Sequence, residues 1–265
     1  MAVRERPRLF ASPLPRPRWR RPKVVVWRRR HLAALVLLVL VGAAAVVAFR
    51  VVKPALQASA LVQNRVIVID PGHGGPDPGA NRGDVLEKDI NLAIGLRLGS
   101  LLSNAGATVI YTRTTDTDLA DQGDPTLRTR KARDLSQRVK IANDAKADVY
   151  LSIHVNGASG SSWAGAQVFF NPNPNPDSRR LALAIQSAVS RVAENTRRMP
   201  LPLYDQYVLK YVTMPAVTIE VGFISNPREA MLLQDAAYQD KLAWAIYLGV
   251  LDFLREGQEP VPAPH

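Results

Sequence analysis

The chain contains no cysteine, and its charged residues are unevenly distributed. Without cysteine it forms neither disulfide bonds nor thiolate zinc sites, and an oxidising compartment is compatible with this composition. The formal net charge is +11 at pH 7, but residues 1–30 hold eleven Lys and Arg and a single acid, Glu5, which amounts to +10. The other residues carry only +1. This near-neutral remainder argues against a surface that follows nucleic-acid phosphates, so we expect no nucleic-acid partner.

An uncharged, mostly apolar segment follows the basic residues directly. It runs from residue 32 to 49, eighteen residues, which is close to the minimum length for crossing a bilayer. Arginines on its N-terminal side favour a cytoplasmic location for residues 1–30 and translocation of everything after residue 50. Three interpretations remain open: an uncleaved anchor over 31–50, a signal peptide cleaved near Ala60, and a buried core helix. The first two place the rest of the chain outside the cytoplasm, either membrane-anchored or secreted.

Strand and helix patterns alternate after a predicted linker at 51–64. This alternation, with mostly apolar strands, predicts an α/β fold with helices on both faces of the sheet. The pattern ends near residue 255, and we expect a disordered tail at 256–265. Prolines in NPNPNP (171–176) predict a loop. The expected strands are 65–70, 107–112, 148–155, 166–171, 207–212 and 216–223, and the expected helices are 87–106, 135–147, 178–196 and those within 227–255.

Chemically capable side chains stand at or near the ends of three predicted strands. They are His73, His154 and Glu220, while Glu87 opens the helix after the first strand. Sites in α/β sheets form where the carboxyl ends of strands meet loops, so these residues are expected to converge. Two imidazoles and one carboxylate are a familiar zinc set that leaves a position for water. A further carboxylate can then accept and deliver a proton.

Each of these residues also has a purely structural interpretation. His154 could be a satisfied core histidine, Glu87 could close a capping box in DVLE, and Glu220 could be the buried partner of an arginine. Asp70, before a proline, either makes a turn or orients the ring of His73. Glycines around His73 suit a loop that approaches a ligand closely. The residues alone leave a two-histidine, one-carboxylate site open without identifying a reaction.

Five stretches of sequence occur in a specific order over about residues 64–255. They are IDPGHGG, LEKDINL, YTRTTD, LSQRVKIANDAKADVYLSIHVN and MPAVTIEVGFISNPREAMLL. Together they resemble the zinc-dependent N-acetylmuramoyl-L-alanine amidases of the third amidase family. The resemblance implies a three-layer α/β sandwich with a roughly six-stranded, mostly parallel sheet. This domain would cover 65–255 and follow the one N-terminal transmembrane or signal helix.

The resemblance also implies roles for individual residues. His73, Glu87 and His154 would bind one Zn²⁺, and Glu220 would be the catalytic acid and base. Since Glu220 lies between apolar neighbours, partial burial should raise its pKa toward the operating pH. Asn156 is a candidate for a substrate hydrogen bond, with turn formation as the alternative. The implied reaction is hydrolysis of the amide between the lactyl group of N-acetylmuramic acid and L-alanine of peptidoglycan stem peptides.

Within the family the chain looks most like the spore-cortex, germination-associated amidases. The sequences SSWAGAQVFF, RKARDLSQR and AENTRR carry this likeness. Such enzymes act during sporulation on the way to muramic-δ-lactam. Two alternatives use the same residues: a catalytically silent wall-binding protein, and a non-haem Fe(II) enzyme. An activating protein partner is left open.

Overall fold

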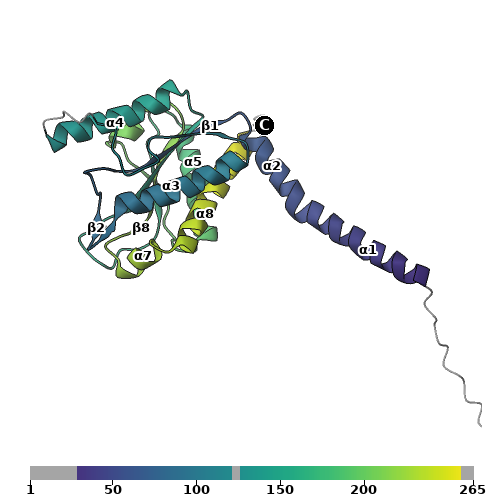
Figure 1. The fold of residues 1–265 in the computed structure, drawn as a ribbon. Coiled ribbons are helices and arrows are strands. Elements are labelled where there is room, and N and C mark those ends of the chain that lie inside the picture. Colours follow the sequence, from purple (N-terminus) through teal and green to yellow (C-terminus); the bar gives the residue numbers. More distant parts are fainter. Residues whose placement is uncertain (1–28, 121–125, 258–265) are drawn as a thin grey trace, which may run out of the picture. The chain divides into compact units, whose positions relative to one another are not determined.

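The computed structural model describes residues 29–120 and 126–257, which fall into two units, 1–50 and 51–265. Helix α1 (Arg29–Val47) belongs to the first unit and continues into a π-helical turn, η1 (Ala48–Val52), which includes the boundary between the two units in the sequence (Figure 1). Residues 31–50 have a mean hydropathy of 3.0, and none of the most apolar window is buried. By length and composition this helix can cross a membrane, and its exposed side chains do not match a core helix. Most of the basic segment 1–30 lies outside the described residues.

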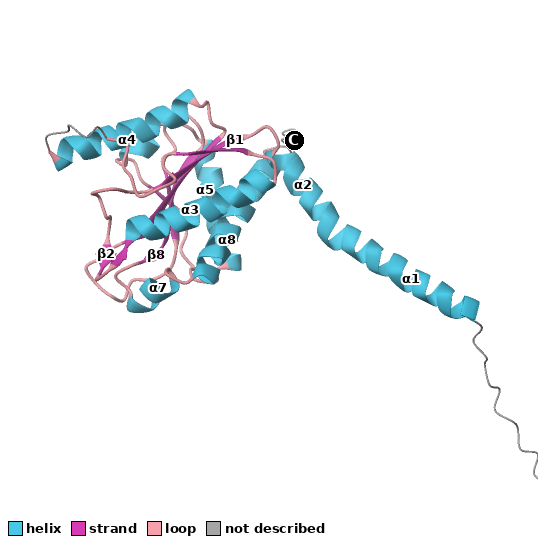
Figure 2. Cartoon of the chain, in the orientation of Figure 1, coloured by secondary structure: helices cyan, strands magenta, loops and turns pink. Residues whose placement is uncertain are grey.

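The second unit is built on a six-stranded sheet, as the resemblance implies. Neighbouring strands follow the order β4-β1-β5-β8-β6-β7. All neighbours pair in parallel except β6 and β8, which are antiparallel. Figure 2 shows the strands in magenta among the helices. The strands are β1 (Val66–Pro71), β4 (Thr108–Tyr111), β5 (Val149–Asn156), β6 (Gln167–Phe170), β7 (Leu201–Pro202) and β8 (Ala216–Phe223).

Helices cover both faces of the sheet because successive strand side chains point to opposite sides. In β1, Ile67 and Ile69 belong to one buried cluster, whereas Val68 belongs to the other. The first cluster receives side chains from five helices, the second from two, and Figure 1 shows α4 on the opposite side from α3 and α8. The helices of the first cluster are α2 (Lys53–Val62), α3 (Glu87–Asn104), α5 (Asp177–Val192), α7 (Pro227–Leu232) and α8 (Ala236–Glu256), and those of the second are α4 (Leu127–Asp144) and α6 (Tyr207–Tyr211).

Two sequence-based expectations are wrong. The segment 51–64 is not a plain linker, because it contains helix α2 (Lys53–Val62), whose Leu61 and Val62 are buried in the larger core. A cleavage near Ala60 would therefore cut inside a packed helix. The expected strand at 207–212 is helix α6. Its buried residues, Val208, Leu209 and Val212, follow a helical spacing rather than alternation.

Smaller differences concern element boundaries. Helix α4 begins eight residues before its expected start, because Thr126 caps it through a hydrogen bond from the backbone of Thr129. The short strand β7 and the hairpin of β2 (Asn81–Arg82) and β3 (Val85–Leu86) had no sequence signal. Residues 171–176 form a loop, as expected. Helix α8 extends to Glu256, and the rest of the expected tail, 258–265, lies outside the described residues.

Candidate metal and catalytic centre

The loop after β1 is held in an unusual backbone conformation. His73 has φ of 62°, in the left-handed region that non-glycine residues seldom adopt. Two arginines bind the carbonyl oxygens of this loop: Arg138 Nη2 donates to His73 O at 2.8 Å, and Arg113 Nη2 donates to Gly72 O at 3.0 Å. Such a conformation persists where surrounding bonds enforce it, so these arginines fix the position of the His73 ring.

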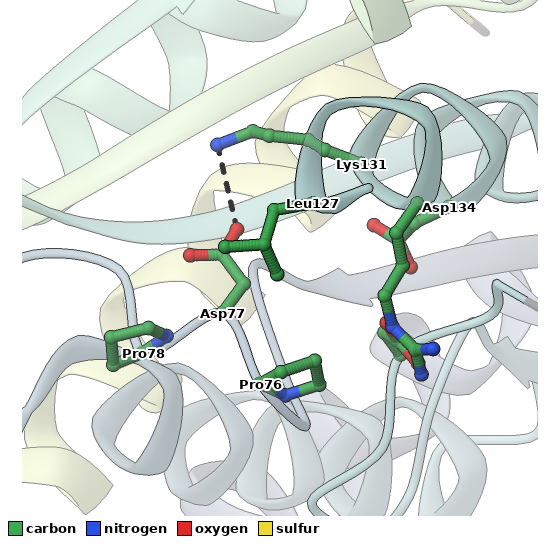
Figure 3. Close-up of a pocket in the computed structure, with 8 residues that line it drawn as sticks. Pro76, Asp77, Pro78, Leu127, Lys131 and Asp134 are labelled. Atoms are coloured by element: carbon green, nitrogen blue, oxygen red, sulfur yellow. Dashed lines mark hydrogen bonds and ion pairs between the residues drawn. The ribbon is translucent and has the colours of Figure 1, made fainter. Parts of the chain in front are cut away.

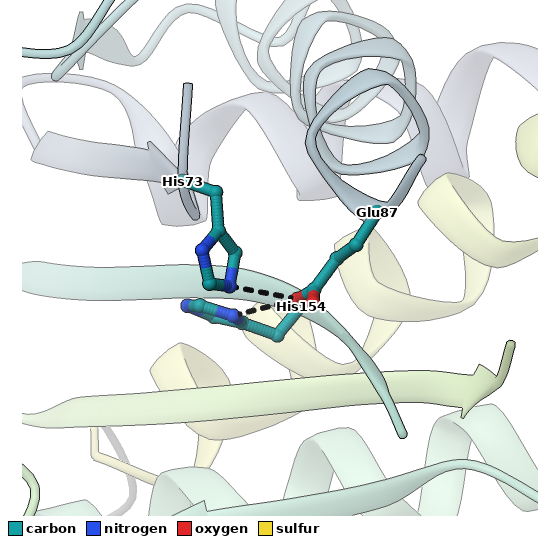
Figure 4. A group of neighbouring side chains, drawn as sticks. All are labelled: His73, Glu87 and His154. Carbon is teal, nitrogen blue, oxygen red and sulfur yellow. Dashed lines mark hydrogen bonds and ion pairs between the residues drawn. The ribbon is translucent and has the colours of Figure 1, made fainter. Parts of the chain in front are cut away.

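His73, Glu87 and His154 meet at one point, although they come from a loop, a helix and a strand (Figure 4). Glu87 Oε1 lies 3.2 Å from His73 Nε2 and 2.9 Å from His154 Nδ1. The two imidazole rings are 5.0 Å apart and nearly perpendicular. One potential ligand atom from each residue lies within 4.8 Å of the others. The predicted convergence of these three side chains is therefore present.

Glu87 is buried and anchored by backbone groups. Its Oε2 accepts a hydrogen bond from Ala80 N at 2.7 Å, and its Oε1 accepts one from Val155 N at 3.0 Å. Burial raises the pKa of Glu87, but the hydrogen bonds and charges of His154 and His73 outweigh it and hold this pKa well below its usual range. The capping-box alternative is wrong, since α3 has no side-chain cap.

Two glycines leave the room that this cluster occupies. A Cβ atom at position 72 would lie 2.2 Å from the His154 ring, and one at position 79 would lie 2.5 Å from Glu87 Oε2. Gly79 also has φ of 67°, which disfavours other residues. Two imidazole nitrogens and a carboxylate oxygen at this spacing suit a divalent ion such as Zn²⁺, with a further position for water. The donor set thus fits the metal that the sequence predicts.

The second ring nitrogen of His73 contacts Asp77, not Asp70. Asp77 Oδ2 lies 2.9 Å from His73 Nδ1. Burial lowers the pKa of His73, but the carboxylates of Asp77 and Glu87 raise it overall, to about 9. A carboxylate on the far nitrogen directs Nε2 toward the cluster. The prediction that Asp70 itself orients the His73 ring is therefore wrong.

Asp70 instead sits in a buried network one step away. Its carboxylate accepts hydrogen bonds from Arg138 and from three hydroxyl groups, those of Thr112, Tyr150 and Ser152. Burial alone would raise the pKa of Asp70, but Arg138 and the hydroxyl donors lower it well below its usual range. Arg138 in turn donates to the carbonyl of His73. Asp70 thus acts on the loop backbone through this arginine.

Glu220 is the immediate neighbour of this cluster in the sheet. It lies directly opposite His154 in the register of β5 and β8. Burial raises the pKa of Glu220 to about 7, with His154 and His73 opposing the shift and Glu87 adding to it. Its Oε2 is buried and has no hydrogen-bond partner in the described chain. No described arginine pairs with it, so the alternative of a buried ion pair is wrong, whereas the expected rise in pKa is confirmed.

A family model described as N-acetylmuramoyl-L-alanine amidase matches residues 67–252. The chain belongs to this amidase family. The germination-specific N-acetylmuramoyl-L-alanine amidase of Bacillus subtilis (strain 168) is 44% identical over 199 residues, covering 75% of this chain and 84% of the relative. The amidase LytC of the same organism is 36% identical, and the match covers 73% of this chain and 36% of LytC.

A solved structure shares both the fold and much of the sequence. The CwlD amidase of Clostridioides difficile, determined in complex with the GerS lipoprotein, is 41% identical to this chain with a TM-score of 0.71. The match covers 73% of this chain and all of CwlD. Together with the family match, this confirms the amidase fold and the predicted likeness to germination-specific members.

Asn156, the candidate for a substrate contact, ends strand β5 two residues after His154. Its backbone carbonyl accepts a hydrogen bond from Ile224 N, next to an irregularity in the β5–β8 register. This contact joins the strand to the turn after β8 and engages only the main chain of Asn156. Its role toward substrate stays a prediction.

The sequence reasoning missed the residues that support the amidase site. Asp77 follows His73 by four residues and stands two residues after IDPGHGG, a spacing that could have suggested their contact. Asp77 also lines a pocket of about 220 Å³ between the loop and α4, where Lys131 Nζ lies 3.4 Å away (Figure 3). Arg113 and Arg138 stand within YTRTTD and LSQR, so the family motifs were the available signal for both.

Proposed function

We propose that this protein hydrolyses the amide between the lactyl group of N-acetylmuramic acid and L-alanine in peptidoglycan stem peptides. One observation carries the proposal: a cluster of two imidazoles and a carboxylate adjoins, across one strand pair, a glutamate with a pKa near 7. A hydrolase needs such a pair of functions, one to bind a metal ion and one to move a proton. Family membership supplies the substrate class.

The proposed roles follow from the chemistry of the side chains. His73, Glu87 and His154 would hold the ion, and Zn²⁺, when bound, supplies Lewis-acid polarisation of the substrate carbonyl. Glu220 would accept a proton from the attacking water and deliver it to the leaving amine of L-alanine. Burial raises the pKa of Glu220 above that of a solvated carboxyl group, which makes it a better proton acceptor. Asn156 would hydrogen-bond the substrate at the end of β5.

The setting of the reaction belongs to the same proposal. Germination-specific relatives support a role in sporulation or germination, on the way to muramic-δ-lactam. The apolar helix over 31–50 would anchor the protein or act as a signal, with the catalytic domain outside the cytoplasm. The structure of CwlD with GerS supports a protein partner for this chain as well.

The test is mass spectrometry of spore-cortex peptidoglycan incubated with the full chain in detergent, with and without a chelator, together with metal analysis. We expect free stem peptides beginning with L-alanine, stoichiometric zinc, and loss of activity on chelation that zinc restores. Intact muropeptides despite bound zinc would favour a silent wall-binding protein. Stoichiometric iron with oxygen consumption would favour the non-haem Fe(II) alternative.

A further inference from the structure

A row of facing side chains leads from the metal cluster across the sheet. His154 on β5, Glu220 on β8 and Gln167 on β6 are direct register partners in neighbouring strands. Directly opposed residues project to the same face of a sheet and lie about 5 Å apart. Beyond Gln167, its Nε2 donates to Met199 O at 2.9 Å, in the segment that enters β7. The row therefore continues past Glu220, away from the two histidines.

Arg198 ends this row as a pre-positioned cation. Its Nη1 donates to Gln167 Oε1 at 3.3 Å, and its Nε donates to Ala164 O at 3.1 Å. Its guanidinium carbon lies 5.4 Å from the centroid of the Trp163 ring and 5.2 Å from that of Phe223. These two rings stack at 6.2 Å. Aromatic faces and two hydrogen bonds restrict the arginine without neutralising it.

The charge of Arg198 is not compensated within the described chain. Among the described residues, no Asp or Glu forms an ion pair with it, and its Nη2, unlike Nε and Nη1, has no hydrogen-bond partner. Trp163, which packs beside it, is 51% exposed. A partly exposed, held guanidinium with spare donors is a site for a carboxylate, since arginine binds carboxylates in fixed geometry.

The two sides of the scissile amide differ in charge. The lactyl carboxyl group of muramic acid forms the scissile amide bond, so the sugar side of that bond has no free carboxylate. The peptide side carries free carboxylates, beginning with the acidic residue after L-alanine. Glu220 protonates the leaving amine, so the peptide leaves from the Glu220 side of the site. Two extended residues span about 7 Å, comparable with one to two strand spacings from Glu220 toward Arg198.

We propose that Arg198, held by Gln167 and Trp163, binds the free carboxylate of the stem-peptide residue that follows L-alanine. Arg198 is thus a specificity-determining residue that selects acidic stem peptides and aligns the leaving amine with Glu220. The inference rests on the proposed amidase function and adds the peptide side of its substrate.

The test compares two muramoyl peptides that differ only in this carboxylate, free in one and amidated in the other. The full chain in detergent is assayed as wild type, Arg198→Gln and Arg197→Gln. Arg197 is an exposed neighbour without a hydrogen bond or ion pair to the part of the chain that the structure describes, so its replacement controls for the lost charge. We expect wild type and Arg197→Gln to prefer the free acid by about 10- to 100-fold in kcat/KM, as a charge-assisted pair would give. Arg198→Gln should lose that preference, mainly through KM.

The outcomes separate this inference from the function on which it rests. If wild type cleaves neither peptide, the amidase proposal fails. If it cleaves both equally, or if Arg198→Gln slows both by the same factor, carboxylate recognition by Arg198 is overturned while the amidase proposal stands. Zinc content and thermal unfolding of each variant show whether it is folded. A Trp163→Leu variant, which keeps the cation but removes a ring that restrains it, should weaken the preference partly, and an unchanged preference would remove Trp163 from the proposal.

Discussion

Replacing Glu220 by Gln should abolish catalysis and at the same time stabilise the metal-free protein. The side chain keeps its shape but loses its negative charge. Burial raises the pKa of Glu220 from its ordinary value of 4.5 to about 7, so the folded state resists ionisation. The unfolded chain ionises as the pH passes 4.5, whereas the folded protein ionises only near 7. Ionisation therefore favours the unfolded state increasingly between these two values and by a constant amount above them.

The expected size follows from the two pKa values. Their difference of about 2.5 corresponds to about 3.5 kcal/mol, at about 1.4 kcal/mol for each pKa unit. The Gln variant should thus be about as stable as wild type at pH 4 and about 3.5 kcal/mol more stable at pH 8. In the zinc-loaded protein, the loss of proton transfer should reduce kcat by about 10²- to 10⁴-fold.

Urea denaturation with a chelator present, at pH 4 and pH 8, measures the stability, and muropeptide hydrolysis measures kcat. Glu229→Gln is the matched control, because the buried carboxylate of Glu229 accepts hydrogen bonds from Gly165 N and Phe223 N. This control should lose stability, since an amide cannot accept both bonds equally well. A Glu220→Gln variant no more stable than wild type at pH 8 would show that burial does not penalise the charge. Unchanged kcat would remove Glu220 from proton transfer.

Three further perturbations test the surroundings of the site. Glu87→Gln should abolish stoichiometric zinc binding, measured by elemental analysis after dialysis, and retention of one zinc per chain would contradict its role as a ligand. Asp77→Asn should weaken zinc affinity by about 10- to 100-fold in a chelator competition, because the far nitrogen of His73 loses its carboxylate; equal affinity would refute this. Asp70→Asn leaves Arg138 with Asp134 as its remaining carboxylate partner among the described residues and should cost about 1–3 kcal/mol in urea denaturation, and a loss below about 0.5 kcal/mol would disprove it. Because the pKa of Asp70 is lowered in the folded state, wild-type stability should fall as the pH drops below about 4, and Asp70→Asn should flatten that fall.

The elements that could be predicted from the sequence are those with a local pattern of apolar residues. Apolar runs and helical periods predicted β1, α3, β5 and β8, because burial of one face repeats at the period of the element itself. The same reasoning placed His73, His154 and Glu220 at the carboxyl ends of strands, where parallel pairing brings distant residues to one edge. The spacing of these residues in the sequence did not show whether they bind a metal ion or pack in the core. The family motifs were needed to decide between these two interpretations.

Other features depended on contacts between segments far apart in the chain. Asp70 and Asp77 are both acids near His73, and only the loop path decided which one reaches its ring. The residues 207–212 are compatible with either a β-strand or an α-helix. Packing of their apolar side chains in the second core cluster selected helix α6. Local preferences in such segments are weak, so tertiary burial decides between them.

The sequence by itself predicted the fold class, the strands that carry the candidate site and its four principal candidate residues, His73, Glu87, His154 and Glu220. Only the tertiary structure decided which groups orient these four side chains. It also decided that Arg198 follows the row of facing residues His154, Glu220 and Gln167. The reason is strand register: the antiparallel insertion of β6 beside β8 sets Gln167 opposite Glu220, 53 positions apart in sequence, and no local pattern records that pairing.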